Sequence, residues 1–209
     1  MLKKSHKALA ISMLPLFMTN FPPFHTNISY IDNLIDKYYT EINTMLNFHN
    51  ITKSITMLSL FIALFYIGSL IPDLDLKFKN FYKKEDKNKL YLYHRQFTHS
   101  ILLFLILFIS SLSYFPNIIG DLAIGLTAFS LGIFTHLLGD MLTGSIPILF
   151  YGHYYNRFSR IGITTFLPHF MHPLFTKEIP KWIERHIFLF FAPIYTINSA
   201  IFIYFFITN

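Results

Sequence analysis

Long apolar runs separated by polar segments are the feature that most restricts the fold of this chain. The runs cover residues 8–24, 54–71, 100–114, 121–142 and 187–207. Inside a bilayer every backbone N–H and C=O must be paired within its own segment, so runs of this kind predict helices. Only 13% of the residues are charged, against roughly a quarter in ordinary soluble domains. The sequence therefore predicts an all-α polytopic membrane helix bundle, a single domain over residues 1–209.

Four of these runs are predicted to be strong transmembrane helices, and the run 8–24 is the weaker one. It is interrupted by Pro15, and its length of about 17 residues is at the low end for a hydrocarbon core ~30 Å thick. Basic residues precede it as in a signal peptide, but no small-x-small cleavage site follows. We expect a retained amino-terminal helix, either a short span or a segment packed against the bundle. Residues 25–53 are expected to form a loop with a short amphipathic helix through Ile31, Leu34, Ile35 and Tyr38.

The distribution of Lys and Arg predicts the topology. Three lie at the amino terminus, seven in residues 76–95 and five in residues 143–186, whereas the opposite loops hold only Lys37 and Lys53. Because cytoplasmic loops retain Lys and Arg, we expect a cytoplasmic amino terminus and a carboxyl terminus on the other side. This arrangement also accounts for the net charge of +6, so no nucleic-acid partner is expected.

With this topology, four segments bring His or Asp side chains to the cytoplasmic face. The residues are His6, Asp73, Asp75, His94, His99, His136 and Asp140. The chain has no cysteine, so a metal site must use imidazole and carboxylate ligands, which suit zinc, manganese, iron or magnesium. The remaining histidines are interpreted as interfacial side chains, although His169 and His172 could reach the same place.

His136 and Asp140 lie four residues apart in the predicted helix 121–142, on one face and about 6 Å from each other. Both could bind one cation, or the aspartate could fix the tautomer of the imidazole. Ionisable groups in an apolar helix usually face a bundle interior or a wet cavity. The alternative interpretation is a capped helix end with a satisfied histidine.

Asp73 and Asp75 follow Pro72, where the helix 54–71 is expected to end. Alternate carboxylates can bridge two cations, or one can bind a cation while the other orients a histidine. The alternative interpretation is a pair of solvated charges at the edge of the membrane.

Polar groups gather just before the third strong span, in the segment His94-Arg95-Gln96-Phe97-Thr98-His99-Ser100. If His94 lies in the loop and His99 in the first helical turn, both can face one cavity. Arg95 is either a charge that sets topology or a bidentate clamp for a phosphate or carboxylate group. Thr98 and Ser100 are expected to cap the helix.

The combined motifs resemble the YdjM-type family of bacterial inner-membrane proteins, which are classed as metal-dependent hydrolases. The motifs are Pro72-Asp73-Leu74-Asp75, His94–Ser100, His136-Leu137-Leu138-Gly139-Asp140-Met141-Leu142-Thr143 and the following Ser145–Leu149. The resemblance covers about residues 1–165, with Ser5 and Gln96 standing where the family has glycine. It implies an inner-membrane location. Through a distant similarity of the family to zinc-dependent phospholipase C and P1-type nucleases, it also implies phosphoester hydrolysis at a zinc site.

The sequence therefore predicts a membrane-bound metal-dependent hydrolase that acts on a phosphoester or lipid-like substrate at the cytoplasmic face of the bilayer. Its metal ligands would be His6, Asp73, Asp75, His94, His99, His136 and Asp140. Seven ligands exceed the needs of one tetrahedral ion, so we expect two divalent ions within a range of one to three, zinc first and manganese or magnesium as alternatives. The catalytic candidates are Asp75 and Arg95, the latter to stabilise developing negative charge. The competing hypotheses are a transporter with a polar pathway and a scaffold whose helices are held together by a structural metal.

Overall fold

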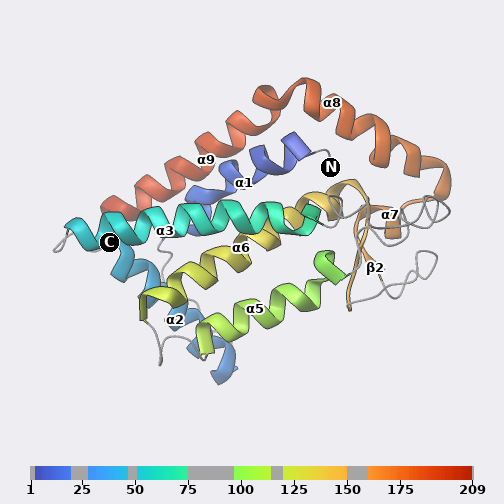
Figure 1. Ribbon diagram of the computed structural model, residues 1–209. Helices are drawn as coiled ribbons and strands as arrows, with labels where there is room; N and C mark the ends of the chain where they lie inside the picture. The colour runs from blue at the N-terminus through green and yellow to red at the C-terminus, as the bar shows by residue number, and fades with distance from the viewer. Residues whose placement is uncertain are drawn as a thin grey trace.

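The computed structural model describes residues 3–19, 28–46, 51–74, 97–113, 120–149 and 160–208 (Figure 1). The long helices are α1 (Lys3–Phe17), α2 (Ser29–Leu46), α3 (Ile51–Leu70), α5 (Ile101–Ser113), α6 (Gly120–Thr143) and α9 (Ile187–Thr208). The shorter elements are the 3₁₀ turn η4 (Phe97–His99), β1 (Ile146–Pro147), β2 (Arg160–Ile161), α7 (Ile163–Phe166), the 3₁₀ turn η7 (His169–Met171), the π-helical turn η8 (Leu174–Glu178) and α8 (Ile179–Arg185). The prediction of an all-α fold is confirmed, since the strands are only two residues long.

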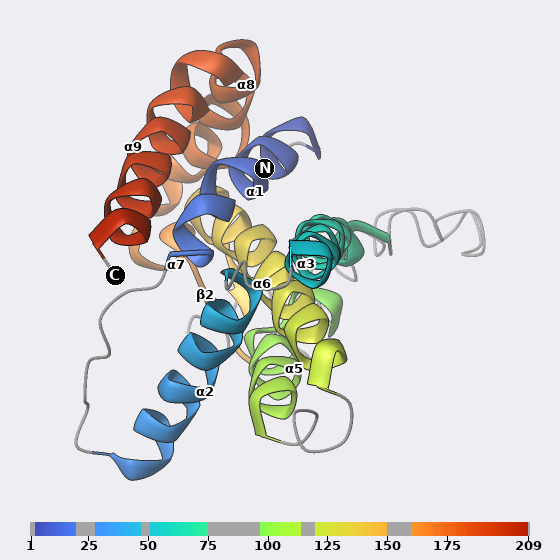
Figure 2. The same ribbon diagram turned by 90° about the vertical axis from the view of Figure 1, so that its left-hand side faces the viewer.

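Helix α6 lies at the centre of the bundle. It packs against α3 on one side and α5 on another, and α1 fills the space between α9 and the α3–α6 pair (Figures 1 and 2). The main apolar core lies where α2, α3 and α6 meet, with Phe61 and Phe65 of α3 against Ile42 and Met45 of α2. All four side chains are almost fully buried, as expected for a helix face that packs against its neighbours.

Three stretches are long and apolar enough to cross a membrane among the described residues: Ile51–Leu74, Leu122–Thr143 and Ile187–Thr208. The expected count of four strong spans is not confirmed, because the described part of α5 has 13 residues and extends for about 20 Å at 1.5 Å per residue. That length is shorter than a hydrocarbon core of ~30 Å. In the window of α9 only 11% of the residues are buried, so most of this helix offers its apolar surface to lipid.

The two amino-terminal segments differ from the sequence expectations in length. Helix α1 begins at Lys3, five residues before the apolar run, so His6 lies inside the helix rather than ahead of it. Residues 20–24 of that run lie outside the described residues. The short amphipathic helix expected near Ile31 is an 18-residue helix, α2, because its apolar positions continue at helical spacing to Met45 and are buried there.

Two glycines allow α3 and α6 to approach each other closely. A Cβ atom at Gly132 of α6 would lie 2.0 Å from the Phe65 carbonyl oxygen, and one at Gly68 of α3 would lie 2.1 Å from the Phe129 carbonyl oxygen. Small residues at such crossings are typical of membrane helix pairs, because they bring the backbones into contact. The close approach sets the position of the last turn of α3 relative to α6.

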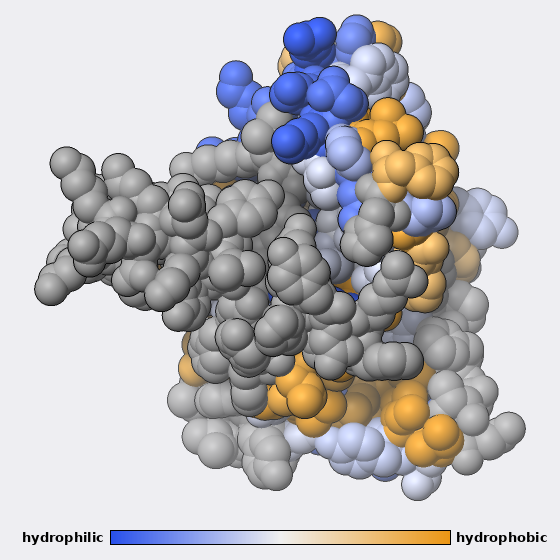
Figure 3. All heavy atoms as spheres, turned by 90° about the vertical axis from the view of Figure 1, so that its right-hand side faces the viewer, coloured by the Kyte–Doolittle hydropathy of each residue, from blue (hydrophilic) through white to orange (hydrophobic). Residues whose placement is uncertain are grey.

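The segment expected to be a long loop, residues 143–186, contains folded elements in its described part. Strand β1 pairs antiparallel with β2, with Ile146 opposite Ile161 and Pro147 opposite Arg160. Helix α8 then leads into α9. Figure 3 views the molecule from the right-hand side of Figure 1, where α8 lies. Hydrophilic side chains gather over the region of α8, and apolar patches lie below them.

The directions of the helices bring four helix ends together at one end of the bundle. The start of α1, the end of α3, the start of α5 and the end of α6 all lie there (Figure 1). Beyond Leu70 the chain of α3 continues as a 3₁₀ turn over residues 71–74, in keeping with a proline at position 72, which removes a backbone donor. This turn carries Asp73.

Candidate metal centre

Five of the seven predicted ligands come together at this end of the bundle. His6 comes from α1, Asp73 from the turn after α3, His99 from η4, and His136 and Asp140 from α6. Two overlapping groups of three have ligand atoms that all lie within 4.8 Å of one another: His6, His136 and Asp140, and Asp73, His99 and His136. Four of the five side chains are at most 2% exposed, and Asp73 is 15% exposed.

Asp140 lies at the middle of the centre and presents both of its oxygens. Its Oδ1 is 3.3 Å from His6 Nε2, and its Oδ2 is 3.3 Å from His99 Nε2 and 3.5 Å from His136 Nε2. Asp73 completes the arrangement, with Oδ2 3.6 Å from His6 Nδ1 and Oδ1 3.7 Å from His136 Nε2 and 4.0 Å from His99 Nε2. Each imidazole therefore faces both carboxylates.

These distances are those of donor atoms around an ion rather than of direct hydrogen bonds. An N–H···O hydrogen bond joins its heavy atoms at about 2.7–3.2 Å, shorter than every separation in the centre. Around a tetrahedral zinc ion with bonds of ~2.0–2.1 Å, neighbouring donor atoms lie about 3.3–3.4 Å apart. Three imidazole nitrogens have no hydrogen-bond partner among the described residues: His6 Nδ1, His6 Nε2 and His136 Nε2. The spacing therefore fits a small divalent cation.

The charge of the centre fits the same kind of ion. The centre combines two carboxyl groups with three imidazoles, and Asp140 is almost fully buried. A buried charge without compensation is costly, so carboxylates in such a place are normally paired or bound to a metal. A divalent cation would neutralise this pair.

A hydrogen bond to α3 determines the tautomer of His136. Its Nδ1 is 2.8 Å from the carbonyl oxygen of Ser69, which can only accept, so Nδ1 carries the proton. The Nε2 lone pair is then directed at Asp73, Asp140 and the space between them. Fixing one imidazole nitrogen through a hydrogen bond to the other is the usual way in which metal-binding histidines are oriented.

Thr98 determines the tautomer and orientation of His99 in the same way. The hydroxyl hydrogen of Thr98 is donated to the carbonyl oxygen of Pro72 over 3.2 Å, so its oxygen, 3.0 Å from His99 Nδ1, accepts from that nitrogen. His99 Nε2 then faces the two carboxylates. Thr98 is therefore not the helix cap that the sequence predicts, whereas Ser100 is one: its Oγ accepts from the backbone N–H of Leu102 in the first turn of α5.

The two groups of three share one atom, His136 Nε2. Because one imidazole nitrogen binds one ion, the groups are alternative descriptions of a single ion site. The expected second ion would need further ligands. Asp75 and His94, together with Arg95, lie outside the described residues, so their predicted roles stay predictions.

Several residues that shape this end of the bundle were not found from the sequence. Ser69 acts through its backbone carbonyl, for which a sequence holds no signal, and Gly132 is recognisable only as a small residue four positions before His136. Arg160, counted in the sequence as a topology-setting charge, is buried and donates to Ser145 Oγ over 3.1 Å and to the Ser145 carbonyl oxygen over 2.8 Å. His172 instead approaches the carbonyl oxygen of Leu167 at 3.1 Å and does not join the centre.

A comparison with protein families shows to which family the chain belongs. The family model described as YdjM inner membrane protein matches residues 42–207. The chain belongs to the YdjM inner membrane protein family. No curated protein and no solved structure matched the chain.

The YdjM match and the sequence motifs overlap over residues 42–165 and differ at the two ends of the chain. The match contains Asp73, His99, His136 and Asp140 and extends through α9, whereas His6 lies before its first residue. The motif resemblance reaches from the amino terminus to about residue 165. Family membership and the three long apolar helices together identify a membrane protein with a buried His/Asp cluster able to hold a metal ion.

Proposed function

We propose that this YdjM-family protein is a membrane-bound metal-dependent hydrolase. The observation that carries the proposal is the buried set of three imidazoles and two carboxylates at the spacing of metal ligands. His6, Asp73, His99, His136 and Asp140 would hold the ion, zinc first and manganese or magnesium as alternatives. A bound divalent ion would supply Lewis acidity and a lowered pKa of its water.

The protein's own groups would prepare the site for this chemistry. Ser69 and Thr98 hold His136 and His99 with Nε2 toward the ion, and Asp73 is the most exposed of the five, so water and substrate would approach from its side. We assign Arg95 to the stabilisation of negative charge that develops on the substrate, and Asp75 to a catalytic or second ligand role. Both follow from their sequence positions beside Asp73 and His99.

The proposed substrate is a phosphoester or lipid-like ester reached at the cytoplasmic face of the inner membrane. Support comes from the position of the centre at one end of the bundle (Figure 1) and from the excess of Lys and Arg in the segments that flank it. A distant relationship to phospholipase C and P1-type nucleases would lead to the same chemistry.

Metal analysis and hydrolysis assays on the same preparations test this function. The purified protein should contain stoichiometric zinc, manganese or magnesium, and His99→Ala and Asp140→Ala should lose most of it together with hydrolysis of phospholipids or generic phosphoesters. His172→Ala is the matched control, because His172 lies outside the centre. Absence of stoichiometric metal from the wild type would disprove the metal centre.

The second candidate is a non-enzymatic scaffold with a structural metal, and the burial of the ligands favours it. The ion would join α1, the end of α3, η4 and α6, four segments distant in sequence. Metal without turnover, with loss of thermal stability in His99→Ala, would support this role. Uptake of metal into proteoliposomes would instead support a transporter.

A further inference from the structure

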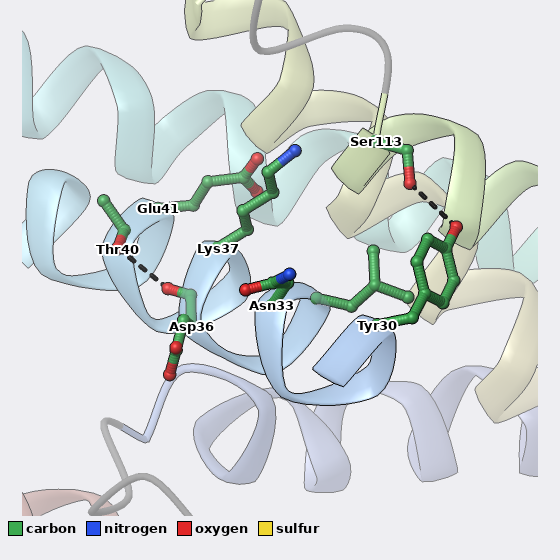
Figure 4. A pocket seen from close by; sticks show the side chains of 8 residues that line it. Tyr30, Asn33, Asp36, Lys37, Thr40, Glu41 and Ser113 are labelled. Carbon is green, nitrogen blue, oxygen red and sulfur yellow. Dashed lines mark hydrogen bonds between the residues drawn. The ribbon is translucent and has the colours of Figure 1, made fainter. Parts of the chain in front are cut away.

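A second polar site lies at the opposite end of the bundle from the metal centre. A cavity of about 630 Å³ opens between α2 and the end of α5. It is lined by Tyr30, Asn33, Leu34, Asp36, Lys37, Thr40, Glu41 and Ser113 (Figure 4). Ser113 is the last residue of α5, whose first residue follows the His99 segment, so the length of α5, about 20 Å, separates the two sites.

Glu41 is the central group of this cavity. One of its oxygens, Oε2, accepts a hydrogen bond of 3.0 Å from Thr127 of α6. The other, Oε1, is buried and accepts no hydrogen bond from the described residues. Burial raises the pKa of this carboxyl to about 7, although the Thr127 bond and Lys37 act in the opposite direction. A buried acceptor without a donor destabilises the folded protein, so the site calls for a ligand that donates hydrogen bonds.

Lys37 supplies the opposite charge in the same cavity. It stands one helical turn before Glu41, and Figure 4 shows both side chains pointing to the same side of α2, whereas Asp36 points away. Among the residues that the structure describes, Glu41 Oε1 has no hydrogen-bond partner. Side chains four residues apart have Cβ atoms about 6 Å apart. A ligand with a cationic donor and an anion a few bonds away would satisfy both.

The surroundings of the cavity indicate where such a ligand comes from. In Figure 2 the helix α3 is seen nearly end-on and α2 from its side, so α2 runs across the axis of the bundle. Ile28, Tyr30 and Ile31 at its start are exposed apolar side chains, and an amphipathic helix in this position is typical of the membrane interface. Phospholipid headgroups occupy that interface.

We propose that this cavity binds a phosphoethanolamine group, with its ammonium on Glu41 Oε1 and its phosphate on Lys37. The N–C–C–O–P chain of this group carries an ammonium and a phosphate a few bonds apart, and Glu41 and Lys37 both line the cavity. A primary ammonium has three N–H donors for the unsatisfied oxygen, whereas a trimethylammonium has none. The site therefore selects phosphatidylethanolamine over phosphatidylcholine, and it does not depend on the proposed hydrolase function.

Native mass spectrometry of the detergent-solubilised full chain tests the proposal. The protein is titrated with short-chain phosphatidylethanolamine, short-chain phosphatidylcholine and free phosphoethanolamine in parallel. We expect one phosphatidylethanolamine bound per chain, at least about 10-fold more tightly than phosphatidylcholine, the scale of a hydrogen bond to a charged group. Equal or tighter binding of free phosphoethanolamine would identify the soluble compound as the source of the ligand.

Matched substitutions separate the site from general lipid binding. Glu41→Gln and Lys37→Gln should each weaken phosphatidylethanolamine binding about 10-fold, and should leave phosphatidylcholine binding unchanged. Glu178→Gln and Lys181→Gln are the controls, since these residues form an exposed ion pair on η8 and α8. Equal affinity for the two lipids, no saturable binding, or wild-type selectivity in both variants would overturn the proposal. If Glu41→Gln does not elute as a monodisperse protein, the result for Lys37→Gln decides.

Discussion

At the scale of single residues, two uncharged oxygens determine how the imidazoles face the metal centre. The Ser69 carbonyl oxygen accepts from His136 Nδ1, and the Thr98 hydroxyl accepts from His99 Nδ1. Thr98 is held by its own bond to the Pro72 carbonyl oxygen, at the turn that carries Asp73. The orientation of His99 and the position of Asp73 are therefore linked through one hydroxyl group.

Thr98→Val removes this hydroxyl with little change in shape. We expect the affinity for zinc to fall about 10–100-fold, the usual effect of losing a hydrogen-bond partner of a metal-binding histidine. Competition with a chromophoric chelator measures it. Thr98→Ser should retain the wild-type affinity, and Thr56→Val, which loses only an exposed bond within α3, is the control. Unchanged affinity in Thr98→Val would contradict the assigned role.

The raised pKa of Glu41 predicts that the stability of the folded protein depends on pH. Burial raises the pKa of Glu41 from its usual value of 4.5 to about 7, so the folded state binds this proton more tightly than the unfolded state. The stabilisation is fully present below the unfolded pKa and is lost as the pH rises through the folded pKa. In detergent without phosphatidylethanolamine, the Tm of Glu41→Gln relative to wild type should therefore increase between about pH 4.5 and about pH 7.

Melting curves of the two proteins across that pH range measure the effect. The other titratable groups that line the cavity, Tyr30, Asp36 and Lys37, are present in both proteins and cancel in the comparison. Lys37→Gln should not reproduce the trend. A Tm difference that stays constant with pH would show that Glu41 does not titrate in this range.

At the scale of elements, the close pair α3–α6 holds the metal centre together. It carries Asp73 beyond the end of α3, the Ser69 carbonyl near that end, and His136 and Asp140 in the last turns of α6. Gly68 and Gly132 bring the two backbones into contact one turn before these groups. The position of the Ser69 oxygen relative to His136 thus depends on a helix contact made by glycines.

Gly132→Ala should disturb both the pair and the centre. The new Cβ would meet the Phe65 carbonyl oxygen at 2.0 Å, and because a backbone atom cannot rotate away, the helices must separate. We expect a loss of about 1–3 kcal/mol of stability, typical of overpacking, and weaker zinc binding. Gly125→Ala is the matched control, because its Cβ meets the end of the flexible Leu64 side chain. Equal Tm and zinc affinity in the two variants would contradict this account.

At the scale of the whole molecule, the two polar sites lie at opposite ends of one apolar bundle. The metal centre gathers the starts of α1 and α5 and the ends of α3 and α6, and the carboxyl terminus of α9 lies at the other end (Figure 1). The flanking segments rich in Lys and Arg join the helices at the end that holds the metal centre. Because cytoplasmic segments retain Lys and Arg, this distribution of charge predicts that the metal centre faces the cytoplasm.

Reporter fusions test this orientation. Alkaline phosphatase, which is active only in the periplasm, should be inactive when fused after residue 90 and active when fused after residue 209. Charge-based orientation predicts this pair of results, because residues 76–95 hold seven Lys and Arg and the chain after Ile187 holds none. Activity after residue 90 would reverse the topology and place the phosphoethanolamine site on the cytoplasmic side.

Hydropathy and charge alone determined the all-α membrane fold, the approximate spans and the convergence of His and Asp residues on one end. Apolar runs must become helices in lipid, and each helix end then has a side of the membrane. Helix bounds were less predictable: α1 begins before its apolar run, because packing against neighbours can extend a helix regardless of hydropathy.

Only the tertiary structure decided how the ligands meet. The sequence offered seven candidates, and the fold brings His6, Asp73, His99, His136 and Asp140 to ligand spacing. The oxygens that orient the imidazoles and the cavity around Glu41 had no signal in the sequence. They arise between residues far apart in the chain, whose distances depend on side-chain packing and on glycine contacts between helices. The sequence pattern alone contains neither the side-chain packing nor the glycine contacts.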